Sequence, residues 1–327
     1  ITDNLGHKSL IINLNDSGAY GFINEISLIS SNYKNSFYLA LHGYGDADMI
    51  NFFNKRGERI LPNAAKKNPV GKDIFESMSK LNANIAIPFS SFHQYQRRDS
   101  FWANKYTTPI SDYALGFPEN KRNKLLNPFQ EVRLHNQYFS SYDISPDPLT
   151  ITKPVEESIF GDDWNQKLNK KQIKDCIDYF QNMKFLLNSF YAINLIVGGQ
   201  RITVIKNKDA KTSIDFAVPK GSLLKAIYND LFDDLLIGNF MKTTLTNATN
   251  LYDPDFTLRV AKFSDNGGVK NINDLRKYKN YYSSNRILRD QLDLKLEFFN
   301  RFIKYYIRTR MGFKLYGIFK NILIRKF

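Results

Sequence analysis

Three short apolar runs, separated by polar segments, set the pattern of the first 95 residues. They lie at 10–14, 36–42 and 84–89, and their length and composition predict β-strands. Between the second and third runs, residues 73–81 have the composition of a helix. Strands that alternate with helices are typical of layered α/β domains. We therefore expect half of an α/β layered domain in this part of the chain.

A second pattern begins after residue 160. Apolar residues at steps of three and four predict a helix over 169–190. Gly198 and Gly199 supply the positive φ angles of a tight two-residue turn, so residues 193–205 are predicted to form a β-hairpin. A third strand at 213–218 and a helix at 222–236 follow. The pattern predicts a small α+β domain built as helix, β-meander, helix.

The predicted elements divide an α/β chain into four parts. Residues 1–120 form the layered half domain, and 121–160 form an irregular linker or loop rich in Pro, Asn and Tyr. Residues 161–283 form the small α+β domain, and 284–327 form a basic helical tail. Within the first part, the polar and basic stretch 54–70 contains two prolines and is expected to be a surface excursion.

The composition is that of a folded protein, with 43% hydrophobic residues, 26 Phe and 19 Tyr. The single cysteine, Cys176, excludes an internal disulfide and a cysteine-rich zinc module, and it fits a reducing, cytoplasmic compartment. The first residues lack the charged and apolar regions of a signal peptide, and no apolar stretch reaches about 18 residues. We expect a cytoplasmic protein without a membrane span.

Basic residues outnumber acidic ones by 46 to 32, and the excess is concentrated at the C-terminus. Residues 301–327 contain eight basic side chains and no acidic one, with apolar residues at helical spacing among them. This pattern is typical of an amphipathic helix on an anionic membrane, bound through Arg301, Lys304, Arg308 and Arg310 at the inner membrane face. Alternatively, the apolar stripe packs on the protein itself. Nucleic acid is disfavoured because no recognised binding fold accompanies the charge.

Asp16 and His93 are the candidate metal ligands. Each follows an apolar run, and layered α/β proteins expose side chains to a cleft at strand ends. A carboxylate and an imidazole are a common pair of metal ligands. The four histidines lie far apart in the sequence, however, and a catalytic zinc site generally has three protein ligands. Asp16 precedes Ser17 and Gly18, so it also fits a carboxylate in a turn.

The segments around these two residues resemble the second half of a metallo-β-lactamase-fold domain, of the branch that includes CMP-sialic acid hydroxylase. The resemblance lies in Gly6-His-Lys-Ser-Leu-Ile-Ile-Asn-Leu-Asn-Asp16, Leu39-Ala-Leu-His-Gly-Tyr-Gly-Asp46 and Ile85-Ala-Ile-Pro-Phe-Ser-Ser-Phe-His93. It covers roughly residues 6–106. A fainter pattern over 198–240 resembles a lipid-carrier-like module.

The resemblance implies half of a metallo-β-lactamase αββα sandwich, in which Asp16 bridges two metals and His93 binds the second. The metal would be Zn, Fe or Mn and would generate hydroxide. The family's H-x-H-x-D-H cluster and its middle histidine would lie upstream of residue 1, so this chain alone would be an incomplete catalyst that can lack the metal. One cysteine cannot hold the iron–sulfur domain of the hydroxylase, so hydroxylation is not expected.

The substrate that the resemblance implies is an anionic sugar or sugar nucleotide in surface polysaccharide metabolism. The predicted contacts are His42, Tyr44, Asp46, Arg97, Arg98 and Lys105. The two arginines suit an anionic group because a guanidinium binds carboxylate or phosphate with two parallel hydrogen bonds. All six also fit structural turns and solvated loops. The pattern predicts neither catalytic residues nor an oligomeric state.

A competing hypothesis comes from the basic tail. The chain could be a non-catalytic membrane-surface or partner-binding protein, in which the metal site has decayed and the C-terminal helix supplies the function. Tight metal binding would favour the enzyme. Vesicle binding that depends on residues 299–327 would favour the adaptor.

Overall fold

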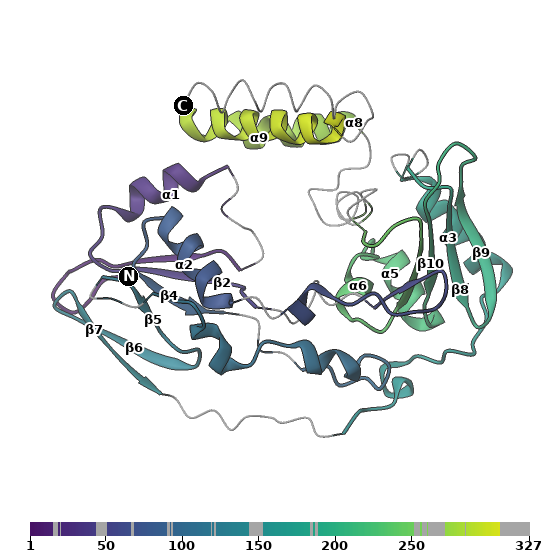
Figure 1. Cartoon of the computed structure of the whole chain (residues 1–327), viewed down its shortest axis with the longest axis horizontal. Coiled ribbons are helices and arrows are strands. Elements are labelled where there is room, and N and C mark those ends of the chain that lie inside the picture. The colour runs from purple at the N-terminus through teal and green to yellow at the C-terminus, as the bar shows by residue number, and fades with distance from the viewer. Residues whose placement is uncertain are drawn as a thin grey trace.

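The computed structural model has two lobes of mixed α and β structure, with a long helix over the first lobe (Figure 1). It describes residues 1–15, 19, 21–43, 51–66, 69–89, 92, 94–118, 120, 122–143, 153–183, 186, 189–251, 256, 260, 272–284 and 286–307. Within the helices, the side chains of 63, 272, 275, 279, 282, 283, 297, 298 and 300–307 are outside the description.

Four parallel strands form the sheet of the first lobe. Their order is β1 (Leu10–Asn13), β2 (Ser36–Ala40), β4 (Ile85–Pro88) and β5 (Lys124–Leu125). The three strands predicted from apolar runs are confirmed. Such runs carry few polar residues because a parallel sheet is usually covered on both faces.

Both faces of this sheet are packed. On one face lies α2 (Val70–Lys80), which buries Ile74 and Met78 and confirms the predicted helix. The hairpin of β6 (Gln130–His135) and β7 (Tyr138–Asp143) covers the other face, where Phe139 meets Phe37 edge to face at 5.8 Å. A shorter helix, α1 (Ile23–Ser30), links β1 to β2.

The β6–β7 hairpin corrects the expectation of an irregular linker over 121–160. Inward and outward positions alternate along both strands, as a half-buried sheet requires. Asn136 and Gln137 form the turn with φ angles of 48° and 62°. A glutamine is uncommon at this left-handed position, where glycine is usual, so the turn carried no strong sequence signal.

The second sheet is mixed, with five strands in the order β3 (Phe52–Asn54), β11 (Lys242–Thr246), β10 (Ser213–Ala217), β8 (Ala192–Val197) and β9 (Gln200–Lys206). The predicted β8–β9 hairpin is confirmed, with Gly198 and Gly199 at φ 55° and 76°. The meander is not formed, because β10 pairs in parallel with β8 and not with β9. The apolar strand β8 lies inside the sheet between β10 and β9, and β9, which carries exposed basic residues, takes an edge.

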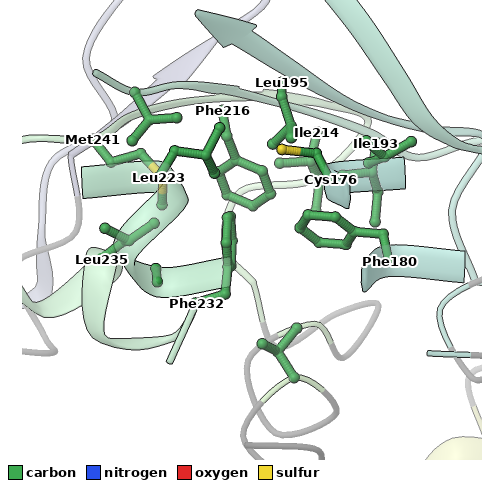
Figure 2. Packing of buried hydrophobic residues seen from close by; sticks show 14 of the residues in the cluster. Cys176, Phe180, Ile193, Leu195, Ile214, Phe216, Leu223, Phe232, Leu235 and Met241 are labelled. Carbon is green, nitrogen blue, oxygen red and sulfur yellow. The ribbon is translucent and has the colours of Figure 1, made fainter. Parts of the chain in front are cut away.

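Helices cover one face of this sheet. They are α3 (Lys170–Gln181), α5 (Lys220–Tyr228) and the single turn α6 (Asp234–Ile237). Figure 2 shows the aromatic centre of this core, where the ring of Phe232 lies 5.0 Å from Phe180 and 5.2 Å from Phe216. Cys176 points into the same core, and burial raises the pKa of its thiol to about 12, so the thiol is unreactive at neutral pH.

Two helix boundaries differ from the sequence prediction. The helix expected over 169–190 ends at Gln181, and the helix expected over 222–236 is divided into α5 and α6. Asp230 has a φ of 58°, a left-handed conformation that ends the helical path between them. Short 3₁₀ turns occur at η1 (Asn63–Lys66), η2 (Phe101–Tyr106), η3 (Ile110–Ala114) and η4 (Glu157–Phe160).

The stretch expected as a surface excursion joins the two lobes. Its first residue, Asn54, ends β3, and β3 pairs in parallel with β11 of the second sheet. A strand from within residues 1–120 is therefore part of the second lobe.

The C-terminal helices are α8 (Ile272–Ser284) and α9 (Leu288–Ile307). The second begins within the tail that was predicted to be helical from residue 284. Asp290 of α9 is only 1% exposed, and its carboxylate accepts the backbone N–H groups of Asn24 and Glu25 at 3.0 and 3.1 Å. It therefore caps the N-terminus of α1 and fixes α9 on the first lobe (Figure 1). Among the described residues, no helix is long and apolar enough to cross a membrane.

Candidate functional site

The carboxyl edge of the parallel sheet is the candidate site. β1, β2 and β4 are parallel neighbours, so their carboxyl ends share one edge, which is where open α/β sheets bind ligands. Asp16 comes three residues after the end of β1, His42 two residues after β2, and His93 five residues after β4. The strands β1 and β4, which precede the two predicted metal ligands, are thus the two neighbours of β2. Both lie outside the described residues, so their convergence stays a prediction.

His42 is held firmly at this edge. Its Nε2 lies 3.0 Å from the Tyr38 hydroxyl oxygen, and its carbonyl oxygen accepts a hydrogen bond of 2.9 Å from the Tyr113 hydroxyl. Burial lowers the pKa of His42 to about 4, although the charge of Asp73 acts in the opposite direction. The imidazole is therefore neutral at pH 7, the form that can accept a hydrogen bond or bind a metal.

The backbone after His42 passes through a narrow space. Gly43 has a φ of 89°, and a Cβ there would lie 2.6 Å from the Tyr113 hydroxyl and 2.8 Å from the Thr108 hydroxyl. Only glycine fits, on conformational and on steric grounds. The next predicted substrate contacts, Tyr44 and Asp46, lie outside the described residues.

A groove of roughly 380 Å³ lies beside this turn and contains one predicted contact, Lys105. Most of its walls come from the segment 105–115, which runs from the end of η2 through η3 and includes Thr108, the residue that faces Gly43. The Lys105 ammonium lies 4.7 Å from the centre of the Tyr106 ring, and Asp112 lies on the same wall. The groove therefore offers one cation, hydroxyl groups and one carboxylate to a small ligand, and Lys105 is its one point of attraction for an anionic group among the described lining residues.

Arg97 lies away from this groove, in a nearly buried cluster between the lobes. Its guanidinium donates two hydrogen bonds to Asp99, at 3.0 and 2.9 Å, and a third of 2.6 Å to Asp162. Asp162 also accepts the backbone N–H and the hydroxyl of Ser222 at the start of α5. The charge of Arg97 is thus matched by carboxylates of the protein itself. Its role as a substrate contact stays untested, and the cluster gives it a structural role.

Arg98 is exposed and forms an ion pair with Glu156, which is also exposed. Its backbone N–H donates to the Val155 carbonyl at 2.9 Å and holds the chain after residue 152 beside it. The guanidinium is accessible to a ligand, although the neighbouring carboxylate competes for it.

The C-terminal cations can be placed only in part. Arg301 and Lys304 lie on α9 with undescribed side chains, whereas Arg308 and Arg310 lie outside the described residues. Earlier in α9, Leu288, Leu292, Leu296 and Phe299 are 71%, 50%, 60% and 60% exposed. Their spacing of four, four and three residues places them on one face of the helix. The apolar stripe predicted in the tail thus begins about three turns earlier.

The described residues do not complete a metal site. Within them, no group of three or more His, Cys, Asp and Glu side chains could hold a metal ion. A catalytic zinc site generally needs three protein ligands, so the donor set does not fit without residues beyond this part of the chain.

A second polar surface was not predicted. On the face of the second sheet opposite α3, α5 and α6, Asn194 donates to Asp215 at 2.7 Å and accepts from Thr203 at 2.7 Å. Arg201 donates two hydrogen bonds to Asp215, at 3.0 and 2.8 Å. The alternation of polar and apolar residues in β9 and β10 was a signal for this face, but its partners could be found only from the strand order.

The chain was also compared with known proteins. A scan against protein-family models, a search of curated proteins and a search of solved structures each gave no match.

Proposed function

We propose that this chain is part of a metal-dependent enzyme of the metallo-β-lactamase fold that acts on an anionic sugar or sugar nucleotide in surface polysaccharide metabolism. In this proposal the first lobe is half of an αββα sandwich. The observation that carries the proposal is the parallel order β1-β2-β4, which directs the segments before Asp16 and His93 to one sheet edge.

The proposal makes the chain an incomplete catalyst by itself. Asp16 and His93 supply two ligands for zinc, iron or manganese, and the remaining ligands come from outside this chain. Because the described residues supply no complete donor set, we assign no chemical step to the metal.

The chain's own contribution is to bind the substrate. Lys105 attracts the anionic group into the groove beside Gly43, where the Thr108 hydroxyl is within the same wall. His42 stays neutral at pH 7 and does not add a positive charge.

Titration with zinc or manganese tests the metal assignment. Two protein ligands should give binding that calorimetry can detect and that Asp16→Ala and His93→Ala each weaken at least tenfold. His135→Ala, on the exposed outer side of the β6–β7 hairpin, is the control and should bind as the unaltered chain does. Equal affinity in all four proteins would reject the metal site.

A second candidate function is attachment to an anionic membrane surface from the cytoplasmic side. It is favoured by the exposed stripe of Leu288, Leu292, Leu296 and Phe299, because a monomeric protein rarely leaves such a row uncovered. The eight basic residues at 301–327 follow directly and would contact anionic headgroups.

Vesicle sedimentation tests this attachment. The triple variant Leu288→Ser, Leu292→Ser, Leu296→Ser should lose most binding to vesicles with 30% phosphatidylserine, on the order of 2 kcal/mol or more by buried apolar area. Leu61→Ser removes an equally exposed leucine outside α9 and should not change binding. Binding that survives the triple variant would show that α9 is not the anchor.

A further inference from the structure

A polar surface lies in the second lobe, on the sheet face opposite α3, α5 and α6. A hollow of roughly 660 Å³ extends over β8, β9, β10 and β11. Its floor contains the side chains that alternate with the core residues, among them Asn194, Thr203, Asp215 and Thr244. We propose that this face binds an acidic saccharide, independently of the site at the parallel sheet.

The floor is a fixed array of hydrogen-bonding groups. Asn194 is only 3% exposed, and its amide is held at both ends, by Thr203 and by Asp215. The two-pronged contact from Arg201 holds Asp215 in turn. These bonds link three neighbouring strands, so the donors and acceptors keep their positions before a ligand arrives. Preorganised polar groups of this kind suit a ligand with many hydroxyl groups.

The rim supplies the charge selectivity. Lys55, Lys206 and Lys211 are exposed, and within the described residues none of them forms an ion pair. Together with Arg201 and Asp215 they give the lining a net charge of +3. Because Arg201 is already paired with Asp215, the three lysines are the cations that remain for a ligand. Carboxylate or phosphate groups on a sugar would therefore be attracted to the rim.

The lining favours a saccharide over single-stranded nucleic acid. Proteins that bind single strands generally stack successive bases on several aromatic side chains. Among the described residues of this lining, Tyr191 at the rim is the single aromatic one. One exposed ring suits the apolar face of one sugar unit, whereas the rest of the surface offers hydroxyl, amide and ammonium groups.

Titration of the full chain with a galacturonic acid tetrasaccharide tests the proposal. The chain should bind it in the micromolar to millimolar range and should bind neutral maltotetraose at least tenfold more weakly. The pair Lys206→Ala, Lys211→Ala should weaken tetragalacturonate binding about tenfold or more. Thr203→Val, which removes from the exposed Thr203 the hydroxyl that holds Asn194, should weaken it several-fold.

The matched control is Lys170→Ala, Lys171→Ala, which removes the same charge from α3 on the opposite side of the sheet. This variant should bind as the unaltered chain does, and unchanged thermal unfolding will show that each variant is folded. Equal losses in both lysine pairs would reject the site, because general charge would then explain binding. Equal affinity for maltotetraose, or tighter binding of a ten-nucleotide oligothymidine, would reject an acidic saccharide as the ligand.

Discussion

The four-stranded sheet has α2 on one face and the β6–β7 hairpin on the other, whereas the helices of the five-stranded sheet cover one face and leave a polar hollow on the opposite face. A sheet packed on both faces can offer ligands only its edges. For a parallel sheet, the carboxyl edge brings several loops together. A sheet with one open face can offer the surface itself, through side chains that point away from the core.

This difference also determines how a substitution in the core of each lobe affects its candidate site. In the first lobe, the candidate chemistry depends on loops after strand ends, where His42 and Gly43 are tightly enclosed. In the second lobe, the polar array lies directly on strands whose other side is the aromatic core. A substitution in the core of the second lobe should therefore also disturb the polar face. A core substitution in the first lobe should affect the candidate site mainly by moving the loops.

The largest expected effect is that of Phe232→Ala. Phe232 is fully buried between Phe180, Phe216 and Phe256, so its truncation should cost about 3–5 kcal/mol. Hydrogen exchange should accelerate in β8, β9 and β10 and remain nearly constant in β1, β2 and β4. Met78→Ala, at an equally buried site under the parallel sheet, should give the reverse pattern. Uniform acceleration in both variants would show that the two sheets unfold as one unit.

Arg97→Ala should be the next most damaging change. It leaves the carboxylates of Asp99 and Asp162 in a nearly buried place without their cation, at a cost of about 3 kcal/mol. Hydrogen bonds from Trp164 and Ser222 still reach these carboxylates and keep the loss from being larger. Urea denaturation measures the loss. Arg98→Ala breaks an exposed pair and should cost under about 1 kcal/mol. Similar losses in the two variants would contradict a structural role for the buried cluster.

Helices, strands and turns with strong local patterns could be predicted from the sequence. The apolar runs that became β1, β2 and β4, the helix α2, and the Gly198-Gly199 turn are all local features. Register and sheet order are not local. Nothing near β10 indicates that it pairs with β8, or that β3 crosses to β11, because these partners are chosen by burial across the whole sheet.

Candidate site residues were predictable only as positions after strands. The parallel order was needed to show that the strands before those positions end at one edge, and the alternation in β10 did not show that Asp215 would meet Arg201. Arg97 illustrates the opposite problem, because a cation next to a candidate ligand suggests a substrate contact. Asp99 lies only two positions from Arg97, but its partner Asp162 lies 65 positions away, so this half of the buried cluster had no local signal.

The pH dependence of stability should distinguish the enclosed edge of the first lobe from the open face of the second. The pKa of His42 is lowered by burial from 6.5 to about 4, so the unfolded chain binds a proton between these pH values and the folded chain does not. Stability is therefore full above pH 6.5 and is lost as the pH falls toward 4. The loss from this residue should be about 2 kcal/mol, allowing for partial exposure. His42→Gln should reduce the difference in urea stability between pH 7 and pH 4.5 by this amount, and His135→Gln, on an exposed strand, should not. An unchanged difference in His42→Gln would show that the imidazole is solvated.

A smaller effect is expected from the N-terminal caps of the helices α3 in the second lobe and α1 in the first. α3 is capped locally by Asn169, whose side chain accepts the Gln172 backbone N–H at 2.9 Å, while the Gln172 side-chain oxygen accepts the Asn169 backbone N–H at 3.0 Å. Asn169→Ala should cost about 1 kcal/mol. The helix α1 is capped instead by Asp290 of α9, far along the chain. Loss of the local cap should therefore increase hydrogen exchange only in the first turn of α3, whereas Asp290→Ala should increase exchange in α1 and α9 together. Exchange that stays confined to α1 in the second variant would show that α9 is held on the first lobe by other contacts.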